Sequence, residues 1–211
     1  DSPAVPSTSF VDQLIAGFRH LLDRSDLRLL LALTALNGLL GRTIIELLPA
    51  LSGQVLQGGS AELAVRVAMA GLGYVLGGLL VSRQAADLAR LMMLVCAAIM
   101  LAGLALISLQ WFLGLAGLAL WVSVLSVVTT VAGTGSQTLI QLTASAEYRG
   151  RVMSVWTMLA MGAPALGAAL LGAGVDGFGF SRVAVWTGGV GVVLVISLYA
   201  RRSRVLTGSD P

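Results

Sequence analysis

Two charged side chains lie inside the first long apolar run of this sequence, where ionised groups are rare. Arg42 and Glu46 are four residues apart, and Asn37 lies one turn deeper in the same run. Four-residue spacing places the guanidinium and the carboxylate on one helix face, where each partly neutralises the other. Charged groups at membrane depth usually face a cavity or one another. Two interpretations remain open: a structural ion pair near the end of a helix, and a gating, proton-coupling or substrate-cavity group.

A second group of polar residues stands in the fourth apolar run. Gln137 and Gln141 are also four residues apart, with Thr134 close by. Amides at membrane depth can bind a substrate or form hydrogen bonds between helices, and the sequence favours neither role. Tyr74, in the second run, either packs against a neighbouring helix or reaches the same cavity.

Residues suited to catalysis or metal binding are scarce. His20 is the only histidine and Cys96 the only cysteine, so the chain has no cluster of the nitrogen and sulfur ligands that zinc prefers. No histidine lies in an apolar run, where it could serve as the base for a serine nucleophile. A phosphate-binding loop and a dinucleotide-binding fingerprint are both absent. We therefore expect no enzymatic activity, no cofactor and no metal ion.

The elements that must position these polar residues are membrane-spanning helices. Of the 211 residues, 57% are hydrophobic and 11% are charged, whereas soluble domains carry about 25% charged residues. A spanning helix needs about 20 mostly apolar residues, and its pattern lacks the alternation of a membrane strand. We therefore predict an all-α membrane protein with six transmembrane helices and the lipid bilayer as a partner. The six runs are 29–48, 62–82, 91–109, 111–143, 152–175 and 183–200.

Arginine placement predicts how these helices are oriented. All thirteen basic residues are arginine, and most of them gather at one set of span ends, including Arg83, Arg90, Arg149 and Arg151. The opposite ends hold little beyond Arg182. Cytoplasmic flanks carry the excess of positive charge, so we expect both termini in the cytoplasm. Because these arginines mark membrane topology, nucleic acid is not a predicted partner.

The predicted topology divides the chain into three parts. Residues 1–26 form a cytoplasmic linker that contains an amphipathic surface helix at 10–24. Residues 27–200 form the six-helix transmembrane bundle, and residues 201–211 form a cytoplasmic tail.

Charged residues also stand at the ends of the second span. Arg83, Asp87 and Arg90 are expected to form a cytoplasmic charge cluster between the second and third spans. At the other end of the second span, Glu62 and Arg66 are expected to be solvated or interfacial.

Glycine and proline recur inside the spans at intervals of three to five residues. Small residues allow helix backbones to approach closely, and proline ends or bends a helix. Tight packing explains most of these positions, and helices that must slide or rock are the second interpretation. The packing and bending candidates are Pro49, Gly73, Gly77, Gly162, Pro164 and Gly167.

Three parts of the chain carry recognisable motifs: 41–50 (GRTIIELLPA), 137–142 (QTLIQL) followed by 147–154 (EYRGRVMS), and 162–167 (GAPALG). They resemble, in order, the seventh helix, the end of the tenth helix with its cytoplasmic loop, and the eleventh helix of bacterial major facilitator superfamily transporters of the drug- and siderophore-exporter type. The RGRVMS stretch is the most specific of these motifs. The resemblance extends over nearly the whole chain.

The resemblance implies two inverted three-helix repeats that form the carboxy-terminal half of a twelve-helix transporter in the bacterial inner membrane. The missing amino-terminal six-helix half, a small-molecule substrate and protons are then the expected partners. The implied function is proton-coupled efflux of small organic molecules by alternating access. Two alternatives stay open: a membrane assembly or scaffold protein, and a half-size transporter that acts as a dimer and has no drug efflux activity.

Overall fold

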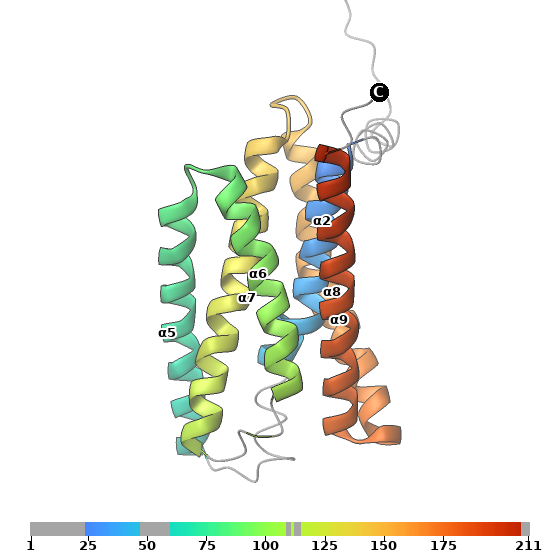
Figure 1. The fold of residues 1–211 in the computed structure, drawn as a ribbon. Helices are drawn as coiled ribbons and strands as arrows, with labels where there is room; N and C mark the ends of the chain where they lie inside the picture. Colours follow the sequence, from blue (N-terminus) through green and yellow to red (C-terminus); the bar gives the residue numbers. More distant parts are fainter. Residues whose placement is uncertain (1–23, 47–59, 109–110, 112–114, 208–211) are drawn as a thin grey trace, which may run out of the picture.

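The computed structural model describes residues 24–46, 60–108, 111 and 115–207, and over these residues the chain is a helical bundle without strands (Figure 1). The first span is built from three consecutive helical segments, and the other five spans are single helices. The elements are α2 (Ser25–Asn37), η1 (Gly38–Arg42), α3 (Thr43–Glu46), α5 (Ser60–Gln84), α6 (Leu88–Ser108), α7 (Leu115–Thr143), α8 (Arg149–Phe178) and α9 (Phe180–Thr207).

The prediction of six membrane-spanning helices is confirmed. Six helical segments are long and apolar enough to cross a bilayer, and each overlaps one predicted run. Their bounds are Ser25–Ile45, Leu63–Gln84, Leu88–Ser108, Gly117–Thr143, Arg149–Val175 and Phe180–Ala200. Several helices extend a few residues past the predicted apolar run. The helical backbone hydrogen bonds continue through the more polar residues that flank the run. The chain is therefore a multi-pass membrane protein.

The connections alternate between the two ends of the bundle. One end holds the start of α2, the α5–α6 turn, the α7–α8 connection and the end of α9 (Figure 1). This arrangement brings Arg28, Arg83, Arg90 and Arg149 to the same end, the one that the sequence predicts to be cytoplasmic. The helix α9 continues to Thr207, so the predicted tail begins inside a helix.

Helix packing is organised around α7. The most extensive contact joins α5 to α7, and α7 also packs on α6 and α2. On the other flank, α8 packs along α2, η1 and α3, while α6 packs on α9. Apolar side chains such as Leu33, Ile99 and Leu125 are fully buried in the core. Between α6 and α7, the Trp121 indole N–H donates a hydrogen bond of 2.8 Å to the Ala105 carbonyl oxygen.

Glycines explain the close approach of α5 to α7. A Cβ atom added at Gly73 would overlap the Ser123 carbonyl oxygen, and one at Gly77 would lie 2.8 Å from the Thr130 Cβ. The packing role predicted for these two glycines therefore has a geometric basis. By contrast, nothing lies within 4 Å of a Cβ placed at Gly162, so that position has no packing requirement within the described chain.

Of the two settings predicted for Arg66, exposure to solvent is wrong. Its exposed fraction is 3%, and the residue has an interaction partner within the chain. The buried residues of α5 follow a helical stripe through Ala70, Gly73, Gly77 and Val81, and Arg66 continues that stripe by one turn. Since the two glycines of the stripe face α7, Arg66 is covered by the helix packing rather than by solvent.

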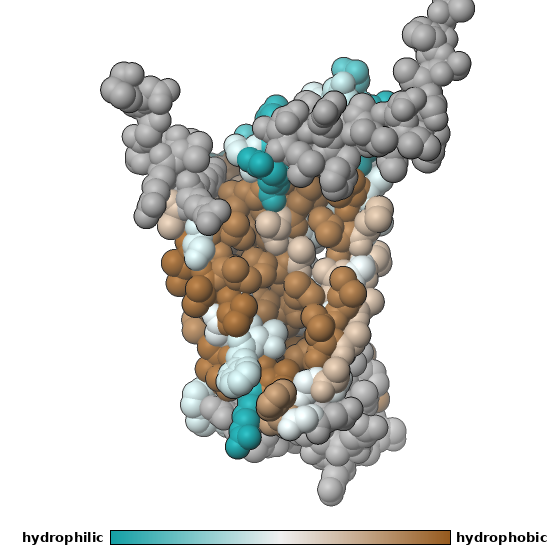
Figure 2. Space-filling view, turned by 90° about the vertical axis from the view of Figure 1, so that its right-hand side faces the viewer, coloured by the Kyte–Doolittle hydropathy of each residue, from teal (hydrophilic) through white to brown (hydrophobic). Residues whose placement is uncertain are grey.

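The outer surface of the bundle is a broad apolar belt. Figure 2 shows hydrophobic residues across the middle of the face that contains α8 and α9, with hydrophilic residues near both ends. Exposed side chains of this belt include Leu166, Leu170, Trp186, Val190 and Val193. A soluble protein would not leave so large an apolar surface uncovered. The belt supports the lipid bilayer as a partner.

Two predicted features lie outside the described residues. These are residues 10–23 of the amphipathic helix predicted at 10–24, with the linker before it, and Pro49.

Candidate functional site

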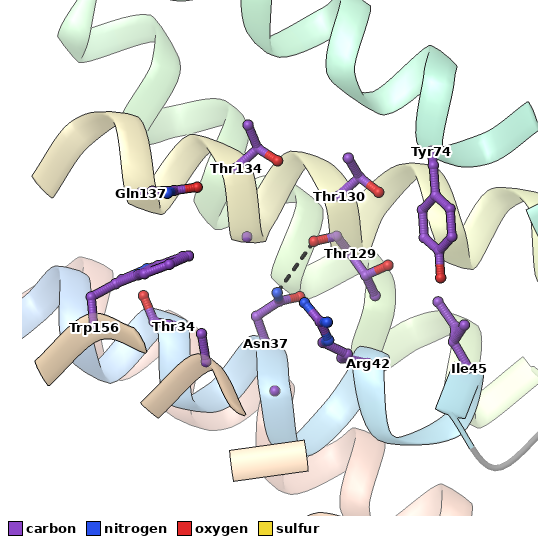
Figure 3. Close-up of a pocket in the computed structure, with 13 residues that line it drawn as sticks. Thr34, Asn37, Arg42, Ile45, Tyr74, Thr129, Thr130, Thr134, Gln137 and Trp156 are labelled. Carbon is purple, nitrogen blue, oxygen red and sulfur yellow. Dashed lines mark hydrogen bonds between the residues drawn. The ribbon is translucent and has the colours of Figure 1, made fainter. Parts of the chain in front are cut away.

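A polar cavity of about 310 Å³ lies between the first span, α5, α7 and α8 (Figure 3). This volume lies at the lower end of the range typical of small-molecule sites. Tyr74 and Thr130 stand about halfway along their spans, so the cavity is near mid-membrane depth. The residues that line it are Thr34, Asn37, Gly38, Arg42, Ile45, Tyr74, Thr129, Thr130, Gly133, Thr134, Gln137, Trp156 and Ala160.

The first span reaches the cavity through a π-helical turn. In η1 the backbone hydrogen bonds skip one residue further than in an α-helix, and the Thr43 N–H donates to the Gly38 carbonyl oxygen. Residues five apart, such as Asn37 and Arg42, would point about 140° away from each other on a regular α-helix. The wider turn instead brings both to the cavity wall. Such π-bulges are frequently found at functional sites.

The π-turn is held in place by α8. A Cβ atom at Gly38 would lie 2.7 Å from the Ala163 Cβ and 3.1 Å from the Pro164 Cδ. The buried Thr43 hydroxyl lies 2.8 Å from the Gly38 carbonyl oxygen and 3.2 Å from the Pro164 carbonyl oxygen. Pro164 interrupts the hydrogen bonding of α8 because it has no N–H. Two irregular helix turns therefore meet at the wall of the cavity, with Gly167 in contact with Thr43.

One face of α7 forms the opposite wall. Thr130, Gly133, Thr134 and Gln137 repeat at helical spacing and all line the cavity. The hydroxyl of Thr130 donates a hydrogen bond of 2.7 Å to the Ser126 carbonyl oxygen. On such a hydroxyl the single proton is already used, so only oxygen lone pairs remain for a ligand.

Asn37 joins the two walls. Its side chain is 5% exposed, and its amide nitrogen donates a hydrogen bond of 3.2 Å to the Thr129 carbonyl oxygen. Because a carbonyl oxygen only accepts, this bond fixes which way the amide points. The absence of a side chain at Gly133 permits the approach, since a Cβ there would lie 3.3 Å from the Asn37 amide nitrogen. The Asn37 Oδ1 atom is buried and has no hydrogen-bond partner.

The two ends of the cavity differ in chemistry. Trp156 and Gln137 lie at one end, and Arg42, Ile45 and Tyr74 at the other, with Asn37 between them (Figure 3). The indole N–H of Trp156 is buried without a partner. Arg42 and Tyr74 are exposed to the cavity opening and each has an interaction partner within the chain.

The structure brings together four of the six predicted cavity residues. Asn37, Arg42, Tyr74 and Gln137 all line the cavity. Gln141 is exposed one turn further along α7 and is not among the lining residues. The side chain of Glu46 lies outside the described part of the structure.

Sequence reasoning did not single out several further lining residues. Thr34, Thr130 and Trp156 contribute a hydroxyl, a second hydroxyl and an indole to the cavity. Thr130 could have been found, since it lies two helical turns before Gln137 on the same face of α7. Trp156 had no such signal, because its helix is connected to the cavity only through tertiary packing.

The predicted cytoplasmic charge cluster contains one clear ion pair. The Arg90 Nε atom lies 3.1 Å from an Asp87 carboxylate oxygen, and the Arg90 backbone N–H donates to the other carboxylate oxygen at 3.0 Å. Asp87 therefore caps the start of α6. In the next connection at the same end, the Arg151 guanidinium lies 5.5 Å from the centre of the Tyr148 ring.

Within the described residues, no group of three or more histidine, cysteine, aspartate or glutamate side chains could hold a metal ion. Comparison of the chain with protein-family models, with curated proteins and with solved structures finds no match.

Proposed function

We propose that this chain is one half of a secondary active transporter of the major facilitator type, and that it moves small organic molecules across a bacterial inner membrane by alternating access. The observation that carries the proposal is the polar cavity at mid-membrane depth, in a bundle that is otherwise apolar. Buried polar residues in the membrane are costly and usually mark a pathway for a substrate. Transporters of this kind bind their substrates near the midplane.

Part of the packing pattern supports two inverted three-helix repeats. An inverted repeat would exchange the first span with α7, α5 with α8, and α6 with α9. Under this exchange the α5–α7 contact corresponds to the contact of α8 with the first span, and both are extensive. The α6–α9 contact corresponds to itself and is also extensive, whereas the extensive α6–α7 contact corresponds to a much smaller one between α9 and the first span. The repeat would thus place the first span and α7 at the centre, where the cavity lies.

The cavity also supports a missing partner half. Arg42 lies within the membrane span Ser25–Ile45 and is exposed in the isolated chain. A charged side chain within a span is unfavourable unless protein or a water-filled cavity surrounds it, so we propose that another protein surface closes over this side of the cavity. The amino-terminal six-helix half is the proposed cover, and it would supply the acidic residues that couple transport to protons. A second copy of this chain is the alternative cover.

Cysteine accessibility tests alternating access and does not require an identified substrate. Cys96 is the only cysteine, so its replacement by alanine gives a background without thiols in the chain. In that background, Thr134→Cys places a thiol at the cavity wall. We expect membrane-impermeant thiol reagents to label it from either face of the membrane in the native transporter, to extents that change with an imposed proton gradient.

A matched control is Gln141→Cys, on the same helix but outside the cavity lining. We expect the thiol at position 141 to react from one membrane face only, and we expect its extent of labelling not to change with the proton gradient. A scaffold protein predicts that the thiol at position 134 also reacts from at most one face under every gradient. That result would exclude alternating access.

A further inference from the structure

The hydrogen-bonding groups of the cavity restrict the chemistry of its ligand, and this inference rests on the proposed transport function. Three threonines at its wall use their hydroxyl protons within their own helices. Thr34 donates to Leu30, Thr129 to Leu125 and Thr130 to Ser126, with oxygen–oxygen distances of 2.9, 2.8 and 2.7 Å. Each hydroxyl therefore offers a ligand only acceptor lone pairs.

The Asn37 side chain adds a stronger requirement. Its amide nitrogen is committed to α7, and its carbonyl oxygen is buried without a hydrogen-bond partner. A buried acceptor that lacks a donor is unfavourable, and buried polar groups are normally paired. Asn37 lines the cavity, so a ligand that brings an O–H or N–H group beside it would satisfy this oxygen after a small side-chain movement exposes it.

At one end of the cavity, Arg42 sets the charge. It is the only described lining residue that carries a full charge. A guanidinium has five N–H donors in a planar fork. Arg42 makes an interaction within the chain and is exposed, so a ligand in the cavity can approach its positive charge. A planar carboxylate is the group that best matches its geometry.

At the opposite end, Trp156 offers an aromatic surface and an unpaired indole N–H. The cavity volume of about 310 Å³ admits one small molecule. Along the cavity, Arg42, Asn37 and the Trp156 ring follow one another in this order (Figure 3).

From this order we infer that the transported substrates are amphipathic organic acids whose carboxylate binds Arg42, whose adjacent hydroxyl or amide N–H donates to the Asn37 Oδ1 atom, and whose apolar group lies against Trp156. A neutral or cationic drug of the same shape would lack the charge match. An acid without the adjacent donor would leave the Asn37 oxygen unpaired.

Four probes, each with a phenyl group, test the requirement for the negative charge and the requirement for the hydroxyl group separately. They are 2-hydroxy-3-phenylpropanoate, its neutral amide, 3-phenylpropanoate, and the cationic 1-amino-3-phenylpropan-2-ol. The assay measures how well each probe slows alkylation of the Thr134→Cys thiol in the native transporter. We expect the hydroxy acid to protect at the lowest concentration. Loss of either the charge or the hydroxyl should raise the half-protecting concentration about tenfold, as the loss of one hydrogen bond to a charged or buried group implies.

Two substitutions assign the effects to residues. Arg42→Gln should make the hydroxy acid and its amide equivalent, while Arg42→Lys should keep the acid preferred. Asn37→Leu should remove the advantage of the hydroxy acid over 3-phenylpropanoate, and Gln141→Ala should leave the order of all four probes unchanged.

Different results would refute the proposed class of substrate and the proposed transport mechanism. Equal protection by the acid and the amide, stronger protection by the cation, or no protection by any probe at millimolar concentration would each overturn the organic-acid inference. None of these results affects labelling of position 134 from both membrane faces, which tests the proposed transport function separately.

Discussion

Substitution of Gly41 by alanine tests the close packing that forms the cavity wall. A Cβ atom at this position would overlap the Cγ2 atom of Thr129 and would lie 3.4 Å from the Thr129 Cβ. The Thr129 side chain cannot rotate away freely, because its hydroxyl donates a hydrogen bond of 2.8 Å to the Leu125 carbonyl oxygen. The π-turn and α7 would have to separate instead.

The expected loss of stability follows from two opposing effects. Insertion of extra atoms into a packed core costs about 1–3 kcal/mol. Replacement of glycine by alanine within a helix offsets about 1 kcal/mol of this through helix propensity. Gly78→Ala isolates the second effect, since nothing lies within 4 Å of a Cβ at that position. The two variants should therefore differ by about 1–3 kcal/mol, or about 2–12 °C in unfolding midpoint for a chain of this size.

The buried thiol of Cys96 is a suitable reporter, because its exposed fraction is 8% and it becomes reactive when the bundle opens. Thermal unfolding of the purified protein is followed with a dye that fluoresces on reaction with thiols. In the Gly41→Ala background, Thr129→Ser removes the overlapping methyl group and keeps the hydroxyl, so it should recover most of the loss. Equal midpoints for Gly41→Ala and Gly78→Ala would refute the packing argument.

Three further predictions concern single side chains. Gln137→Ala should reduce transport several-fold because this amide lines the cavity, whereas Gln141→Ala should leave it unchanged in the same vesicle assay; equal effects would remove the cavity from the mechanism. Asp87→Ala should destabilise the bundle by about 1 kcal/mol through loss of a helix cap, and Asp87→Asn by only a few tenths, because asparagine caps equally well and the exposed ion pair adds little. Thr43→Val should lower stability by about 0.6–1.7 kcal/mol, as expected for a buried hydrogen bond between membrane helices, and an unchanged midpoint in the thiol assay would contradict the role given to its hydroxyl.

Much of the architecture follows from local sequence. The number of spans is fixed by six apolar runs of sufficient length, and hydrogen bonding within each run can only be satisfied by a helix in lipid. The grouping of Arg28, Arg83, Arg90 and Arg149 at one end follows because each span reverses the direction of the chain. The polar face of α7 was equally predictable, since Thr134 and Gln137 repeat at helical spacing.

Other features could not be read from local sequence because they depend on neighbouring helices. Arg66 belongs to a buried stripe of α5, although its charge and its place near a span end predicted solvent exposure. Gln141 continues the polar spacing of Gln137 but lies beyond the cavity. A periodic pattern indicates which residues share a face, and it does not indicate how far the neighbouring helix extends along that face.

The same division holds for Asn37 and Arg42. The sequence by itself determined that Asn37 and Arg42 lie within a membrane span, where each needs a polar environment. Only the tertiary structure decided that they share one wall of a cavity, because regular α-helical geometry would turn them about 140° apart. The π-turn that joins them exists where Gly38 packs on Pro164 of α8. Such a turn is unfavourable in an isolated helix, and contacts from a distant part of the chain stabilise it.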